Sequence, residues 1–155
     1  IEALKNDGVK IVIPYFHWGY EKATKPSPYQ VDLAHFAIDS GADMVVGSHS
    51  HVIQSLEDYK GKLIAYSLAN FCFGGNSNPQ DMRTFILRTK LNFIGDELSN
   101  MEYEVLPATI SSVSSKNDYV PTLATGTKGA NILKYMNELS PTLKGKISDK
   151  YFTLQ

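Results

Sequence analysis

The sequence predicts an α/β fold in which parallel strands come first and antiparallel hairpins follow. An apolar segment, an amphipathic helical segment and a second apolar segment succeed one another over residues 9–46. This order favours parallel pairing through a right-handed crossover. Downstream, Lys60-Gly61 and Gly95-Asp96 each separate two strand-like segments, as hairpin turns do. Because 43% of the 155 residues are apolar and 20% are charged, the chain can bury a core.

The start of the chain has the pattern of the last turns of a helix. Ile1 and Leu4 share one face, and Gly8 suits the left-handed residue that follows a helix end. A strand follows at once, and position 1 is not methionine. We therefore expect residues 1–155 to be the C-terminal portion of a larger domain. The alternatives are a single domain and a short helix at a mature N-terminus.

The next elements form the predicted parallel unit. Residues 9–16 are expected to be a strand covered on both faces, because the run is apolar beyond Lys10. A helix should run from Pro28 to Ser40, with Gly41 as its stop. Residues 43–46 are expected to be a short second strand.

The second half predicts two hairpins and a final helix. The paired segments are residues 53–58 with 62–68, and residues 83–93 with 98–106. Alternation of apolar and polar residues from Phe85 onward indicates a sheet with one solvated face. A helix is expected over residues 128–139, ended by Pro141.

Bulk properties exclude several classes of protein. The formal net charge is −1 and no basic block occurs, which argues against nucleic acid as a partner. The single cysteine, Cys72, excludes an intrachain disulfide framework. No signal peptide and no apolar run of about 20 residues is present in this stretch, so no anchor is expected within it.

Three of the four histidines lie where two of the predicted strands end. His17 follows the first strand, and His49 and His51 follow the second in a loop that begins at Gly47. Open α/β sheets bind ligands at the carboxyl ends of their strands. Neutral imidazoles are the usual ligands of divalent transition metals such as Mn, Fe or Zn. His35 falls inside the helical pattern, so we expect it to be hydrogen-bonded or solvated rather than a ligand.

A two-metal site also needs carboxylates, because they offset the repulsion between the cations. The acidic residues nearest to the histidines in the sequence are Glu21, Asp39, Asp43 and Glu57. Asp43 is expected at a strand start, away from the site. Glu21 lies four residues beyond His17 and is placed to reach the same crevice. A solvated charge beside Lys22 is the alternative for Glu21.

Several strings in the first 110 residues resemble the poly-γ-glutamate capsule biosynthesis family CapA/PgsA. They are His17-Trp18-Gly19-Tyr20-Glu21, then Pro28 and Gln30, the stretch 40–54, Tyr59-Lys60-Gly61-Lys62 and Tyr66-Ser67-Leu68-Ala69-Asn70-Phe71. The resemblance covers residues 1–110 as a family-like core. Residues 111–155 form a C-terminal extension without a recognised motif. Ala69 departs from the pattern, because the family usually has glycine there.

That family is similar to a branch of the calcineurin-like metallophosphoesterases. The resemblance implies half of an α/β/β/α sandwich, with His17, His49 and His51 as metal ligands. It also implies that the other ligands of the superfamily precede Ile1. His17 and His51 are the candidate catalytic residues, because either imidazole can donate a proton to a leaving group. Trp18 and Asn70 are possible lining residues, although packing for Trp18 and turn capping for Asn70 are the simpler interpretations.

Two functions follow from this resemblance. The first is a capsule biosynthesis protein with a metal-dependent hydrolase site for a phosphoester, or for an amide. The alternative is a non-catalytic component that binds metal or polyanion in a cell-surface polymer export or anchoring complex. In either case the expected partners are the upstream portion of the same protein, other capsule-synthesis or export subunits, and an anionic polymer or phosphoester substrate. The family resemblance implies the extracellular face of the bacterial membrane, and we expect residues 1–155 alone to be inactive.

Overall fold

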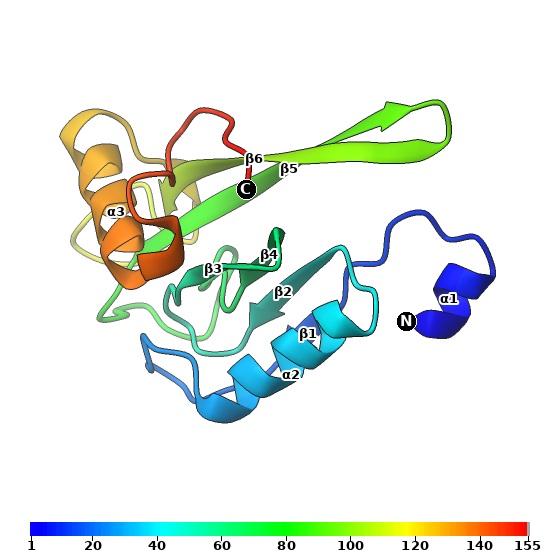
Figure 1. Ribbon diagram of the computed structural model, residues 1–155. Helices are drawn as coiled ribbons and strands as arrows, with labels where there is room; N and C mark the ends of the chain where they lie inside the picture. Colours follow the sequence, from blue (N-terminus) through cyan, green and yellow to red (C-terminus); the bar gives the residue numbers. More distant parts are fainter. Residues whose placement is uncertain (155) are drawn as a thin grey trace.

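The computed structural model describes residues 1–154 as two β-sheets stacked against each other and flanked by helices (Figure 1). The first sheet has the order β1-β2-β4-β3, and its strands are β1 (Tyr15–His17), β2 (Met44–Ser48), β3 (Leu56–Tyr59) and β4 (Lys62–Ala65). The second sheet has the order β5-β6-β7, with β5 (Arg83–Ile94), β6 (Glu97–Thr109) and β7 (Thr122–Leu123). The helices are α1 (Glu2–Asn6), α2 (Pro28–Asp39), α3 (Gly126–Leu139) and a 3₁₀ turn, Pro141–Leu143.

Two apolar clusters hold these layers together. One lies between the two sheets and includes Val46, Leu63, Phe85 and Val105, with Met136 of α3 packed into its side. The other lies between the first sheet and α2 and includes Ala34, Val45, Ile64 and Trp18. Val45 and Val46 therefore serve opposite faces of β2, which explains why β2 has no polar alternation.

The predicted parallel unit is confirmed. β1 pairs with β2 in parallel, β2 pairs with β4 in parallel, and α2 forms the connection between β1 and β2. Ser27 caps α2 in a reciprocal capping box with Gln30, and Pro28 occupies the first turn. The fold class is thus the mixed α/β arrangement that the sequence predicts, consistent with part of a metallophosphoesterase-like fold.

Both hairpins are confirmed at their predicted turns. Lys60 and Gly61 adopt φ values of 53° and 73°, which match the twist of the short hairpin β3–β4. The β5–β6 hairpin is longer than predicted, and its tip at Ile94 extends beyond the core (Figure 1). The final helix α3 is also confirmed, whereas the short strand β7 was not predicted.

The prediction of a strand over residues 9–16 that is covered on both faces is wrong. Only residues 15–17 form a strand, and Val9, Ile13 and Tyr15 are exposed. The segment before β1 is held beside β2 by a side chain and not by strand pairing. The Asp43 carboxylate accepts from the Val12 N–H at 2.9 Å. β1 is the edge of its sheet among residues 1–154, so half of its backbone lacks a neighbouring strand. Among the same residues, no helix combines the length and apolar character needed to cross a membrane.

Candidate functional site

The parallel pairing of β1 and β2 brings the three predicted histidines to one end of the first sheet. His17 ends β1 and is paired with Ser48, the last residue of β2, so His49 follows immediately beside it. The ring centroids of His17 and His49 are 4.5 Å apart, and those of His49 and His51 are 6.1 Å apart. The structure therefore gathers His17, His49 and His51 at the carboxyl ends of parallel strands.

The loop that carries His49 and His51 has an unusual backbone. His49 has a φ of 107° and His51 a φ of 59°, both in the left-handed range that side chains with a Cβ rarely adopt. Such strained conformations concentrate at functional sites, where the surrounding structure holds them in place. Here the Ser50 hydroxyl donates to the Val52 carbonyl at 2.8 Å, and Ser50 is fully buried.

Asn70 fixes the orientation of the His51 ring. Its Oδ1 lies 2.7 Å from Nδ1 of His51, while its amide nitrogen donates to the His51 carbonyl at 3.5 Å. Since the amide oxygen can only accept, His51 Nδ1 carries the proton and Nε2 presents its lone pair. Asn70 is thus in contact with a predicted ligand, His51.

Glu21 is the acidic residue that reaches this cluster. Its Oε1 lies 4.0 Å from His51 Nε2, with the Glu21 side chain 63% exposed. The other acidic candidates lie elsewhere: Glu57 binds His35 at 3.0 Å, and Asp43 binds Lys5 at 2.6 Å. The expectation that Asp43 lies away from the site is confirmed.

Two buried glutamines hold the loop that carries Glu21. Gln54 donates to the carbonyls of Ala23 and Lys25 at 2.9 and 3.2 Å, and it accepts from Gln30 at 2.9 Å. Gln30 is fully buried and also accepts from the Ser27 N–H. Both glutamines fall within the family-like strings, but residue type and spacing alone predicted no role for them.

A groove of about 700 Å³ opens beside His51. Its walls include Glu21, Lys22, Asn70, Phe73, Asp81 and Arg83. Arg83 donates to Asp81 at 2.8 Å and lies over the Tyr135 ring at 3.6 Å; the Asp81 hydrogen bonds raise the pKa of Arg83. The ring of Phe73 lies 4.8 Å from that of His51. Phe73 and Arg83 were missed from sequence, because they lie on either side of a Gly- and Asn-rich loop, residues 74–79, that carries no chemical motif.

Trp18 is a packing residue in the cluster between the first sheet and α2, next to the strand ends that carry the histidines. It is 6% exposed, stacks on Phe16 at 4.6 Å, and donates from Nε1 to the Tyr66 carbonyl at 2.9 Å. A Cβ on Gly47 would lie 2.3 Å from that Nε1 and 2.4 Å from the Tyr66 carbonyl oxygen. Only glycine at position 47 therefore allows β2 to contact Trp18. Gly47 lies close to the end of β2, just before the loop that carries His49 and His51.

The donor set fits a transition metal in part. Imidazoles at His17, His49 and His51 are suitable ligands, and the Asn70 contact leaves His51 Nε2 free to bind. Among residues 1–154, however, no group of three His, Cys, Asp or Glu side chains is arranged to hold an ion. These residues can supply nitrogen ligands to a metal, and Glu21 is the carboxylate that approaches them, 4.0 Å from His51 Nε2.

Comparisons with known proteins bear on this part of the chain. A model of the bacterial capsule synthesis protein family PGA_cap matches residues 1–75. The capsule biosynthesis protein CapA of Bacillus anthracis is 36% identical over 146 residues, covering 92% of this chain and 36% of that protein. The PGA biosynthesis protein CapA of Bacillus subtilis (strain 168) is 37% identical over 109 residues, covering 68% of this chain and 29% of that protein. A probable polyglutamine synthesis accessory protein of Mycobacterium tuberculosis is 43% identical over 56 residues, covering 36% of this chain and 15% of that protein.

The chain spans about a third of the length of the two Bacillus relatives. The family match covers the segment that holds His17, His49, His51 and Asn70. The strings quoted above, which run from His17 to Phe71, fall within this segment. The chain belongs to the CapA family of bacterial capsule synthesis proteins.

Proposed function

We propose that this chain forms one side of a metal-dependent hydrolase site in a protein of capsular poly-γ-glutamate synthesis. The observation that carries the proposal is the gathering of His17, His49 and His51 at the ends of two parallel strands, with strained backbone at two of them. The names of the Bacillus relatives support the biological setting. The substrate class we propose is a phosphoester, or an amide of the polymer.

In this proposal, residues of this chain bind the metal, orient the His51 ring and supply a proton to the leaving group. His17, His49 and His51 would hold a divalent transition metal, probed first with Mn, Fe and Zn. When bound, such a metal polarises the substrate and activates water. Asn70 holds the His51 ring, and the Glu21 carboxylate lies 4.0 Å from its Nε2. His17 is exposed, and its Nδ1 lies 3.4 Å from the Ser48 hydroxyl. The alternative role for His17 or His51, in place of metal binding, is to donate a proton to a leaving group.

A second candidate is a non-catalytic component of a polymer export or anchoring complex. It is favoured by the absence, among residues 1–154, of three ligating side chains already arranged around one point. In that role the groove beside His51 would hold a polyanionic chain through Lys22 and Arg83. For both candidates we propose a location at the extracellular face of the bacterial membrane and a role together with other capsule-synthesis or export subunits, as the family resemblance implies.

Elemental analysis of the full-length protein tests the first candidate. We expect wild type to carry a divalent transition metal and the double variant His49→Ala/His51→Ala to lose it. His35→Ala is the matched control, because His35 binds Glu57 and stacks on Tyr59, away from the cluster. Equal metal content in wild type and the double variant would contradict the proposal.

Turnover distinguishes the two candidates. We expect full-length wild type to hydrolyse a phosphoester or a γ-glutamyl substrate, and the double variant to lose that activity. Bound metal without turnover of either substrate class favours the non-catalytic role. The family resemblance implies that further ligands of the metal precede Ile1, so we expect residues 1–155 alone to be inactive. Robust turnover by residues 1–155 would refute this expectation.

A further inference from the structure

One wall of the groove beside His51 is made by residues 73–81, the groove loop, which form no helix or strand. Phe73, Asn76 and Gln80 are among the residues that line the groove from this loop. Two adjacent glycines follow Phe73, and glycine loses more conformational freedom on folding than any other residue. A loop of this composition keeps one shape only if contacts from elsewhere in the chain hold it.

Asn117 holds the groove loop from the C-terminal extension. Its Nδ2 donates to the carbonyls of Phe73 and Asn76 at 3.2 and 3.0 Å, and its backbone N–H donates to the Ser77 carbonyl at 2.8 Å. Its side-chain oxygen accepts from the Tyr119 N–H at 2.9 Å, so the amide uses its donors and its acceptor together. Because Asn117 is only 3% exposed, water cannot readily replace these bonds.

Residues 111–118, the supporting loop, are held together by their own hydrogen bonds. The hydroxyl of the fully buried Ser111 lies 2.8 Å from both the Lys116 carbonyl and the Asp118 carboxylate. The same carboxylate accepts from the hydroxyl and the N–H of Ser112, and these hydrogen bonds lower the pKa of Asp118. The supporting loop therefore presents Asn117 from a fixed position just beyond the end of β6.

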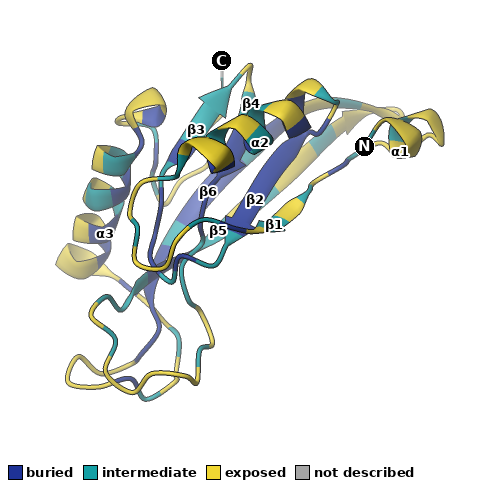
Figure 2. Ribbon diagram, turned by 90° about the horizontal axis from the view of Figure 1, so that it is seen from below, coloured by how far each residue is buried: buried dark blue, intermediate teal, exposed yellow. Residues whose placement is uncertain are grey.

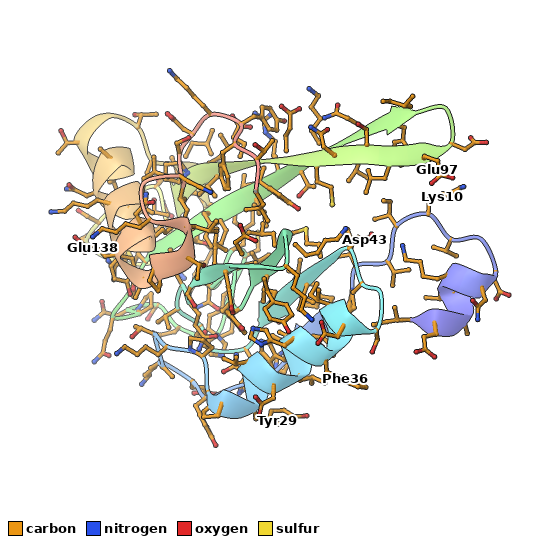
Figure 3. The ribbon with its side chains drawn as sticks, viewed as in Figure 1. Lys10, Tyr29, Phe36, Asp43, Glu97 and Glu138 are labelled. Atoms are coloured by element: carbon orange, nitrogen blue, oxygen red, sulfur yellow. The ribbon has the colours of Figure 1, made fainter. Side chains whose placement is uncertain are left out.

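The antiparallel pairing of β5 and β6 brings the two loops together. Arg83, which begins β5, pairs with Thr109, which ends β6, and the Ile110 N–H donates to the Met82 carbonyl at 3.0 Å. The groove loop thus enters the sheet where the supporting loop leaves it. The turn that joins the two strands, marked by Glu97, lies at the other end of the hairpin (Figure 3). Figure 2 shows that the loops opposite this turn are mostly exposed, so their shape depends on the few buried contacts they make.

We propose that Asn117 is a positioning residue, which fixes the groove loop in the arrangement that accepts the ligand of the candidate site. It acts through Phe73, whose carbonyl it binds and whose ring lies 4.8 Å from that of His51. The C-terminal extension then shapes the site, although it lies beyond residues 1–75, which the family model matches. The inference rests on the proposed function in one respect, since it takes the groove as the place where the polymer binds.

The variant Asn117→Asp in the full-length protein tests the proposal. It keeps the size of the side chain and the acceptor for Tyr119, and it removes both amide donors to the groove loop. Asn137→Asp is the matched control. Asn137 donates to the carbonyls of Leu133 and Ile147 at 3.0 and 2.8 Å, so the same substitution removes two donors elsewhere in the extension. A general loss of stability should appear in both variants, whereas an effect on the groove should appear only in Asn117→Asp.

Two measurements distinguish positioning from a merely structural role. The Asn78 N–H donates to the Asn76 side chain at 2.8 Å within the groove loop, and its hydrogen exchange should be about 10–100-fold faster in Asn117→Asp, because the loop loses two bonds. The dissociation constant for a short γ-linked oligoglutamate should rise about tenfold, because the ligand must then order the loop. Bound metal should stay at the wild-type level, and Asn137→Asp should change none of these values.

Wild-type exchange at Asn78 in Asn117→Asp would overturn the proposal. An unchanged dissociation constant, or an equal effect of Asn137→Asp, would overturn it as well. Failure of the wild type itself to bind the oligoglutamate would instead contradict the binding of polymer in the groove. In that case the exchange measurement alone decides whether Asn117 fixes the groove loop.

Discussion

Substitution of Gly47 by alanine should damage the sheet directly beneath the histidine loop. The added Cβ would lie 2.3 Å from Trp18 Nε1 and 2.4 Å from the Tyr66 carbonyl oxygen. The second contact is with backbone, so no rotamer change can relieve it. The indole must move, and its hydrogen bond to Tyr66, now 2.9 Å, must lengthen or break.

The magnitude follows from these two effects. Leaving a buried donor and acceptor unpaired costs about 1–3 kcal/mol. Forcing extra volume into a packed region costs about 1–3 kcal/mol more. The free energy of unfolding should therefore fall by about 2–6 kcal/mol, a large part of the roughly 5–15 kcal/mol that stabilises a typical protein.

Urea unfolding followed by the fluorescence of Trp18, the single tryptophan, measures this change at the affected contact. Gly74→Ala is the matched control, because nothing lies within 4 Å of the Cβ that it would add. We expect Gly74→Ala to leave the midpoint nearly unchanged. If Gly47→Ala unfolds within about 1 kcal/mol of wild type with the same denaturant slope, the steric reasoning is refuted.

Three further substitutions test other parts of the structure. Asn70→Ala should raise the dissociation constant of a metal bound by His51 about 10–100-fold, because the ring loses its orienting partner; titration against Asn100→Ala, on the remote hairpin, checks this. Gln54→Leu should lower the free energy of unfolding by about 1–3 kcal/mol and speed amide exchange in residues 19–25, since the loop loses two hydrogen bonds. Burial alone would raise the pKa of Asp43, but hydrogen bonds from Lys5 and the Val12 N–H hold it below its usual value. The stabilisation from Asp43 is thus present above the unfolded pKa of about 3.9 and lost as the pH falls through the lower folded pKa. The free energy of unfolding, measured by urea titration, should therefore be lower for Asp43→Asn than for wild type by about 1.5–3 kcal/mol near pH 7. The difference should be much smaller near pH 2.

Local patterns were enough to predict most of the fold. The α2 boundaries followed from Pro28 and Gly41, and the hairpins followed from the turn residues Lys60-Gly61 and Gly95-Asp96. The error at residues 9–16 has a non-local cause. Whether an apolar run pairs and is covered depends on what lies beside it, and β1 is a sheet edge within residues 1–154.

Some residues of the candidate site could likewise be predicted from local sequence, whereas others depend on tertiary contacts. His17, His49 and His51 could be named from sequence, because strand ends and residue type carry the signal. The contacts of Asn70 with His51 and of Gln54 with the loop depend on tertiary geometry that no spacing encodes. Phe73 and Arg83 reach the groove only because the loop after Asn70 folds back beside His51.

Ala69 shows how a departure in sequence acquires a physical meaning. The family resemblance leads us to expect glycine at this position, and the structure gives Ala69 a φ of 64°, where glycine is favoured. An alanine there costs about 1–2 kcal/mol of backbone strain. Its methyl group packs against the core between the sheets, which offsets part of that cost. Ala69 directly precedes Asn70, so together with His49 and His51 it places strained backbone on both sides of the Asn70–His51 hydrogen bond. Strain on both sides of one contact is what a site held in a fixed geometry requires, and it supports a function for this loop beyond packing.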